Sequence, residues 1–166
     1  MKTVKLDINY TEYSSIDEME PQDIELVKAA IEAQKGSYAP YSTFNVGAAL
    51  RLEDGTIVKG ANQENAAYPS GLCAERTAMF AASANNPGKA MLSLAIVGGF
   101  NGTLSDTPCS PCGACRQVMA EYQTLAGRPM SKHKTTYTPK KEWLKPASEY
   151  AEKLTTQFYQ QEMDKL

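Results

Sequence analysis

Three cysteines in two short blocks constrain the fold of this chain more than any other feature of its sequence. The first block reads Cys73-Ala74-Glu75-Arg76, and the second reads Pro111-Cys112-Gly113-Ala114-Cys115. An i, i+3 spacing places Cys112 and Cys115 on one face of a helix, where their sulfurs can share a metal ion. Three thiolates leave one corner of a tetrahedral zinc site open, which is typical of catalytic rather than structural sites. The fold is therefore expected to bring two helix starts to one zinc ion.

Two further residues of the first block add chemistry to this metal site. Glu75 lies two residues after a candidate ligand, so its carboxylate can exchange protons with water at the metal as a general acid and base. A first-turn Glu that only favours the helix dipole is the alternative. Arg76 can donate to a thiolate sulfur and offset the negative charge that three thiolates leave on zinc. Helix N-termini at Cys73 and Cys112 would offset the same charge, and their N–H groups could bond the sulfurs.

Cys109 offers an alternative, because with the three candidate ligands it could close a structural site of four thiolates. It precedes Pro111 and lies outside the helical face of the second block, so we expect it to be a bystander. Disulfides are not expected, since the N-terminus lacks the apolar segment of a secretory signal and cysteine pairs in an intracellular chain more often indicate metal or catalysis. We expect a cytoplasmic protein with one zinc ion per subunit.

The composition argues against two classes of partner. The chain has 166 residues, of which 42% are hydrophobic and 22% charged, and its formal net charge is −2. These values are ordinary for one globular domain with a hydrophobic core. Polynucleotide binding requires a basic surface, and a membrane span requires a long apolar run. We therefore expect neither a nucleic acid nor a membrane as partner.

Periodicity predicts alternating helices and strands. A helix is expected over residues 21–34, with the stripe Ile24, Val27, Ala30 and Ile31 buried. A strand over residues 44–52, a turn at Asp54-Gly55 and a strand over residues 56–61 form a hairpin. A helix from Cys73 to about residue 85, a buried strand over residues 91–97 and a helix over residues 112–122 follow. This order predicts a three-layer α/β arrangement.

Two further motifs accompany the cysteine blocks. The four stretches, in chain order, are Tyr38-Ala39-Pro40-Tyr41-Ser42-Thr43-Phe44-Asn45-Val46-Gly47-Ala48-Ala49, Gly60-Ala61-Asn62-Gln63-Glu64-Asn65-Ala66-Ala67-Tyr68, Cys73-Ala74-Glu75-Arg76-Thr77-Ala78 and Pro111-Cys112-Gly113-Ala114-Cys115-Arg116-Gln117-Val118. Together they resemble the zinc-dependent cytidine and deoxycytidylate deaminase family, and most of all its small, three-cysteine, homotetrameric type.

The resemblance implies a three-layer α-β-α fold with a mixed central sheet, and a homotetramer. It implies hydrolytic deamination of cytidine and deoxycytidine to uridine and deoxyuridine, by zinc-activated water with Glu75 as proton shuttle. It places Asn62 and Glu64 at the ribose hydroxyls, Phe44 against the base and Ala74 beside the substrate. Two alternatives stay open: a deaminase of a modified cytosine nucleoside such as blasticidin S, and a catalytically silent zinc-binding protein with an altered C-terminus.

The sequence stops resembling the family after Gly127. Residues 128–143 are mostly polar and basic, and we expect no buried strand among them. A polar helix is expected to begin at Pro146, with the stripe Tyr150, Leu154 and Phe158. We expect an N-terminal arm over residues 1–20, a deaminase domain over 21–127 and a divergent tail over 128–166. The tail could be a native extension, a disordered appendage or the product of a reading frame shifted near Met130. His133, the one histidine, is expected to be solvated.

Overall fold

The computed structural model describes residues 11–106, 108–128, 130 and 133–135. Its elements, in chain order, are a 3₁₀ helix Ile16–Glu18, α1 Pro21–Gln34, β1 Phe44–Leu52, β2 Ile57–Ala61, a 3₁₀ helix Tyr68–Ser70, α2 Ala74–Asn85, β3 Met91–Phe100, α3 Gly113–Ala126 and β4 His133–Thr135. Within the described residues, no helix is long and apolar enough to cross a membrane.

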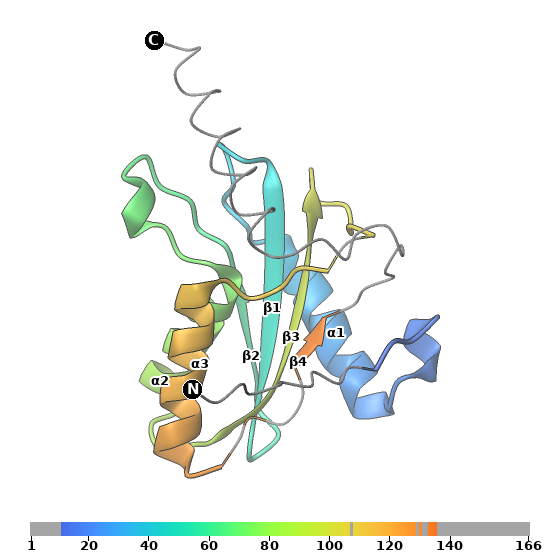
Figure 1. Ribbon diagram of the computed structural model, residues 1–166, viewed down its shortest axis with the longest axis vertical. Coiled ribbons are helices and arrows are strands. Elements are labelled where there is room, and N and C mark those ends of the chain that lie inside the picture. Colours follow the sequence, from blue (N-terminus) through green and yellow to red (C-terminus); the bar gives the residue numbers. More distant parts are fainter. Residues whose placement is uncertain (1–10, 107, 129, 131–132, 136–166) are drawn as a thin grey trace, which may run out of the picture.

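The strands form one mixed sheet with the order β2-β1-β3-β4 (Figure 1). Strand β1 pairs antiparallel with both β2 and β3, and β4 pairs parallel with β3. Helix α1 packs on one face of this sheet, and α2 and α3 pack on the other. The predicted three-layer α-β-α fold with a mixed sheet is therefore confirmed.

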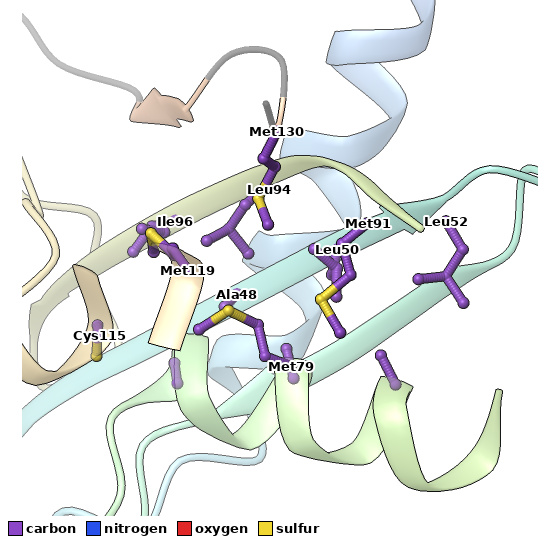
Figure 2. Packing of buried hydrophobic residues seen from close by; sticks show 13 residues of the cluster. Ala48, Leu50, Leu52, Met79, Met91, Leu94, Ile96, Cys115, Met119 and Met130 are labelled. Atoms are coloured by element: carbon purple, nitrogen blue, oxygen red, sulfur yellow. The ribbon is translucent and has the colours of Figure 1, made fainter. Parts of the chain in front are cut away.

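Each face of the sheet carries its own hydrophobic core. Alternate residues of β1 point to opposite faces, so Ala48 and Leu50 pack toward α2 and α3 while Ala49 packs toward α1. Met79 of α2 and Met119 of α3 meet on the first of these faces (Figure 2). Because both faces of β1 are covered, its burial does not alternate between buried and exposed residues.

Two glycines let the helices lie directly against the strands. A Cβ atom at Gly47 would overlap the backbone of α1 at Ala30, and one at Gly60 would overlap the backbone of α2 at Ala78. Glycine is required at such points because only its missing side chain permits this approach of one backbone to another. The contact at Gly60 fixes the N-terminal half of α2, where the first cysteine block begins.

The predicted bounds of α1 and β1 agree with the structure, but the predicted buried stripe of α1 is only half right. Val27 and Ala30 are buried, whereas Ile24 and Ile31 are half-buried and pack at the border of the core. Leu26 is buried in their place. The Asp54-Gly55 turn is present, and Gly55 adopts a positive φ of 87°. Helix α2 ends at Asn85, in agreement with the predicted end at about residue 85.

A short strand, β4, lies within residues 128–143, where the sequence shows no pattern of a buried strand. It pairs through its backbone with Leu94–Ile96 of β3, although its sequence has no apolar alternation. Met130, just before it, is 5% exposed and lies near Leu94 in the core on the α2 and α3 face of the sheet (Figure 2). The predicted helix from Pro146 with its stripe Tyr150, Leu154 and Phe158 lies outside the described residues, as does the environment of the His133 side chain.

Candidate active site

Three cysteines meet where α2 and α3 begin. Cys73 is the N-cap residue of α2 and Cys112 that of α3, while Cys115 lies one turn into α3. The Sγ atoms of Cys73 and Cys112 are 3.8 Å apart, and those of Cys112 and Cys115 are 3.5 Å apart. All three sulfurs lie within 4.8 Å of one another. We call these three residues the metal trio.

The metal trio has the dimensions of a zinc site. A zinc–sulfur distance of about 2.3 Å in a tetrahedral site separates pairs of sulfurs by about 3.8 Å. The observed separations of 3.5 and 3.8 Å match this value without rearrangement of the helices. Cys112 is exposed and Cys115 buried, so the trio is open on one side. Neither N-cap cysteine accepts a capping hydrogen bond from its own helix through its side chain, and the positive end of each helix dipole opposes the thiolate charge there.

The thiols of the trio differ in acidity. Hydrogen bonding to Cys115, followed by hydrogen bonding to Arg76, lowers the pKa of Cys73 to about 5. The pKa of Cys115 is raised, first because it bonds the Cys73 sulfur and then because it is buried. The two shifts have opposite directions because both follow from one hydrogen bond shared by the two sulfurs. A thiolate is the form of cysteine that binds metal.

Glu75 is a buried carboxyl group beside the trio. Its residue is 4% exposed, in the first turn of α2. Burial raises the pKa of Glu75, and the negative charge on Cys73 raises it further. A carboxyl group whose pKa is moved toward neutrality can both accept and donate a proton during one reaction. The burial argues against a surface Glu that only favours the helix dipole.

Arg76 lies on the same turn and faces the first sulfur. Its Nη2 atom is 3.8 Å from Cys73 Sγ, and this bond is the first cause of the raised pKa of Arg76. Its Nε–H is buried and has no hydrogen-bond partner within the described part of the chain. Arg76 therefore places a positive charge and an unused N–H donor beside the trio. Both would stabilise the negative charge of three thiolates bound to one cation.

Cys109 stands apart from the trio. Its Sγ lies against β3 at Gly98, where a Cβ atom would overlap it, and the Phe44 ring lies 3.0 Å from the same point. Burial raises the pKa of Cys109 to about 11, and the charges of Glu75 and Cys73 raise it in the same direction. Cys109 is a neutral, half-buried thiol between the trio and Phe44.

A second polar cluster lies where the loop before β1 meets the segment after β2. Its members are Ser37, Ser42, Phe44, Asn62 and Glu64, and we call it the loop network. Asn62 Oδ1 accepts from Ser37 Oγ and from Val46 N, and its Nδ2 donates to Phe44 O at 2.9 Å. Among the described residues, these bonds use both lone pairs and one of the two amide protons of Asn62, so one N–H remains for a ligand.

Glu64 is held in a similar way. Its Oε2 accepts from the backbone N–H groups of Tyr41, at 2.9 Å, and Ser42, at 3.2 Å. Its Oε1 accepts from Ser42 Oγ. A carboxylate offers about four lone-pair positions, so these three bonds leave one acceptor position without a partner in the described part of the chain. Asn62 and Glu64 together retain one donor and one acceptor, which is the complement of a hydroxyl group.

The remaining predicted site residues lie at the borders of these clusters. Phe44 is half-buried and stacks edge to face on the exposed Phe100, with ring centroids 4.9 Å apart. Ala74 is fully buried in the core, so its methyl group packs rather than faces solvent. Ser42 is a participant that sequence reasoning missed. It stands inside a quoted motif, but its two partners become visible only in three dimensions.

Comparison with known proteins gives relatives for most of the described chain. The family described as "Cytidine and deoxycytidylate deaminase zinc-binding region" matches residues 20–126. The cytidine deaminase of Halalkalibacterium halodurans is 50% identical over 98 residues, which cover 58% of this chain and 68% of that protein. The crystal structure of cytidine deaminase from Burkholderia pseudomallei superposes with a TM-score of 0.54 at 41% identity, covering 68% of this chain and 90% of that one. The structure of the Mycobacterium leprae enzyme gives a TM-score of 0.53 at 40% identity, covering 63% and 82%.

Proposed function

Because this chain belongs to the cytidine and deoxycytidylate deaminase zinc-binding family, we propose that it deaminates cytidine and deoxycytidine hydrolytically. The products are uridine or deoxyuridine and ammonia. The observation that carries this function is a buried carboxyl group with a raised pKa, next to three thiols spaced for zinc. The chain is a zinc-dependent hydrolase in this account, and the metal trio is its cofactor site.

Glu75 moves the protons of the reaction. A zinc ion held by Cys73, Cys112 and Cys115 would supply the Lewis acid that lowers the pKa of the attacking water. Glu75 accepts a proton from that water as the water oxygen bonds to C4 of the pyrimidine, and gives this proton to the ring nitrogen. It then transfers the second proton to the amine, so that the C4–N bond breaks, ammonia leaves and a C4 carbonyl forms. The burial of Glu75 supports this role, because it keeps the proton affinity of the carboxylate high.

The loop network holds the nucleoside. The free N–H of Asn62 and the free lone pair of Glu64 bind one sugar hydroxyl, which is both an acceptor and a donor. The half-buried Phe44 ring packs against the pyrimidine. Ala74 lines the base through its backbone, since its methyl group is buried. These roles are supported by the unused hydrogen-bonding positions of both polar side chains.

The working form of the enzyme is a homotetramer in the cytoplasm. Large apolar side chains are exposed on the described surface, at Tyr41, Tyr68, Phe100, Leu104 and Leu125. Exposed apolar groups of this size favour a surface covered by another subunit. All four cysteines are free, which agrees with a reducing compartment.

Loss of ultraviolet absorbance by cytidine tests the function, with Glu75→Ala as the blank. We expect turnover by the zinc-loaded protein and none by the variant. A soluble, zinc-loaded protein that does not turn over cytidine would contradict the proposal and favour a silent zinc-binding protein. Competition between cytidine and blasticidin S tests the alternative substrate, and we expect cytidine to be deaminated preferentially.

A further inference from the structure

The Ser42 hydroxyl lies between two groups of the proposed nucleoside site. It donates to Glu64 Oε1 and accepts from the backbone N–H of Phe44 at 3.0 Å. A serine hydroxyl has a single proton, and the bond from Phe44 N occupies one of its lone pairs. The bond from Phe44 thereby turns the hydroxyl so that its proton points to the carboxylate.

This hydroxyl is the one side-chain donor to Glu64 within the described part of the chain. The other two donors are the backbone N–H groups of Tyr41 and Ser42, and both reach Oε2. Oε1 has Ser42 Oγ as its partner. Without the hydroxyl, Oε1 would lose this bond, and the carboxylate would be held only by the two backbone N–H groups at Oε2.

The backbone around Ser42 is arranged to keep this contact. Thr43 has a φ of 56°, in the left-handed region that a β-branched residue rarely adopts. Its N–H bonds Ala39 O, and its carbonyl accepts from Asn101 N. The chain is thus held in a strained turn that brings the Ser42 side chain and the Phe44 N–H together. Strain of this kind persists only when surrounding bonds determine the conformation.

We propose that Ser42 is a positioning residue for sugar recognition. Its hydroxyl fixes the orientation of the Glu64 carboxylate, so that the one unused acceptor position faces the sugar hydroxyl. This inference rests on the proposed function, because it concerns the same nucleoside site. Ser42 is exposed, so its removal is expected to disturb nucleoside binding more than folding.

We assign the hydroxyl at Glu64 to the 3′ position, because the 3′-hydroxyl is the secondary hydroxyl that cytidine and deoxycytidine share. The test therefore compares cytidine with 3′-deoxycytidine, which lacks it. We expect Ser42→Ala to lower kcat/KM for cytidine about tenfold, as loss of a well-aligned bond to a charged group does. The kcat/KM for 3′-deoxycytidine should change less than about twofold, because this nucleoside has no hydroxyl to bond to Glu64. Ser42→Thr should restore the preference for cytidine. Thr43→Val is the matched control, since it removes a neighbouring hydroxyl that bonds the Ser42 carbonyl.

Equal losses for both nucleosides, or no loss for cytidine, would overturn the inference and leave Ser42 a purely structural residue. If the zinc-loaded wild type turns over neither nucleoside, the proposed function fails by itself. Calorimetric binding of uridine and 3′-deoxyuridine then decides the role of Ser42. About tenfold weaker binding of uridine alone by Ser42→Ala supports the inference, whereas unchanged binding, or no binding of uridine by the wild type, overturns it.

Discussion

The metal trio and the loop network differ in how far the protein satisfies its own polar groups. In the trio the sulfurs contact one another, and Arg76 Nε has no partner within the described part of the chain. In the loop network Asn62 makes three hydrogen bonds and Glu64 accepts three. The trio requires a cation to balance its charge, whereas the loop network is already part of the fold.

This difference separates two kinds of site residue. The exposed ligand Cys112 can be removed from the zinc-free protein at little cost in stability, because its thiol is neither part of the core nor bonded to the backbone of its helix. A residue such as Asn62 connects three segments of the chain before any ligand arrives, so its removal affects both the fold and the binding of a nucleoside. Loss of activity when such a residue is replaced therefore does not by itself show that the residue binds the substrate.

The largest effect is expected at the trio. Cys112→Ser should abolish tight zinc binding and, with it, all turnover, because two thiolates and a hydroxyl do not hold zinc as three thiolates do. The measurement is zinc content per chain after dialysis. Cys109→Ser is the matched control and should keep one zinc per chain. Loss of zinc from Cys109→Ser would show that the metal trio does not hold the zinc ion without Cys109.

Glu75→Gln separates metal binding from proton transfer. The variant should retain its zinc but lose about 10²- to 10⁴-fold in kcat, which is the usual contribution of a positioned acid–base group. Steady-state kinetics with cytidine, beside zinc content, give both quantities. A variant that loses its metal would show that Glu75 acts in the trio itself and not on the substrate.

Asn62→Ala tests whether the loop network is structural. It should lower the free energy of unfolding of the zinc-free protein by about 1–3 kcal/mol, because partly buried groups at three positions lose their partner. Urea denaturation measures this. Cys112→Ser in the same zinc-free state should change the value by less than about 0.5 kcal/mol. Equal losses of unfolding free energy in the two variants would contradict the claim that the loop network, unlike the metal trio, is part of the zinc-free fold.

Gly98 lies at the border between the two clusters. Gly98→Ala should destabilise the protein by about 1–3 kcal/mol, since its Cβ would overlap Cys109 Sγ and crowd the Phe44 ring. The double variant Gly98→Ala/Cys109→Ala should recover part of this loss, because the thiol that obstructs the new methyl group is gone. A double-mutant cycle in urea gives the coupling. Additive effects would show that Cys109 and Gly98 do not interact.

The smallest effect on stability is expected at the surface ion pair of Asp54 and Lys89, which lies outside both clusters. The hydrogen bond from Lys89 lowers the pKa of Asp54 to about 2 from its ordinary value of 3.8, helped by the Thr56 N–H. A lowered pKa stabilises the fold above the unfolded value, and this contribution disappears as pH falls from about 4 to about 2. Asp54→Asn should flatten the stability profile in that window. An unchanged profile would show that the pair contributes nothing.

Local sequence predicted much of the fold. Proline at the first position of α1, the alternating apolar residues of β1 and the Asp54-Gly55 turn each act within a few residues, so the bounds of these elements were predictable. The metal trio was predictable for the same reason, because the spacing of its cysteines and their helix starts are local features.

The features that the sequence did not predict depend on contacts between segments that are distant along the chain. Gly47 lets α1 rest on β1 at Ala30, and the resulting packing leaves Ile24 and Ile31 at the border of the core. Strand β4 pairs through its backbone without an apolar pattern, so periodicity could not reveal it. The bond between Ser42 and Glu64 joins positions 22 residues apart, and no local rule predicts it.

X-ray absorption at the zinc edge of the loaded protein tests the central claim most directly. An open site of three thiolates predicts three sulfurs at about 2.3 Å and one oxygen or nitrogen at about 2.0–2.1 Å. The spectrum of Cys109→Ser should be the same. Four sulfurs in the native protein, falling to three in Cys109→Ser, would mean a closed structural site and would contradict the account.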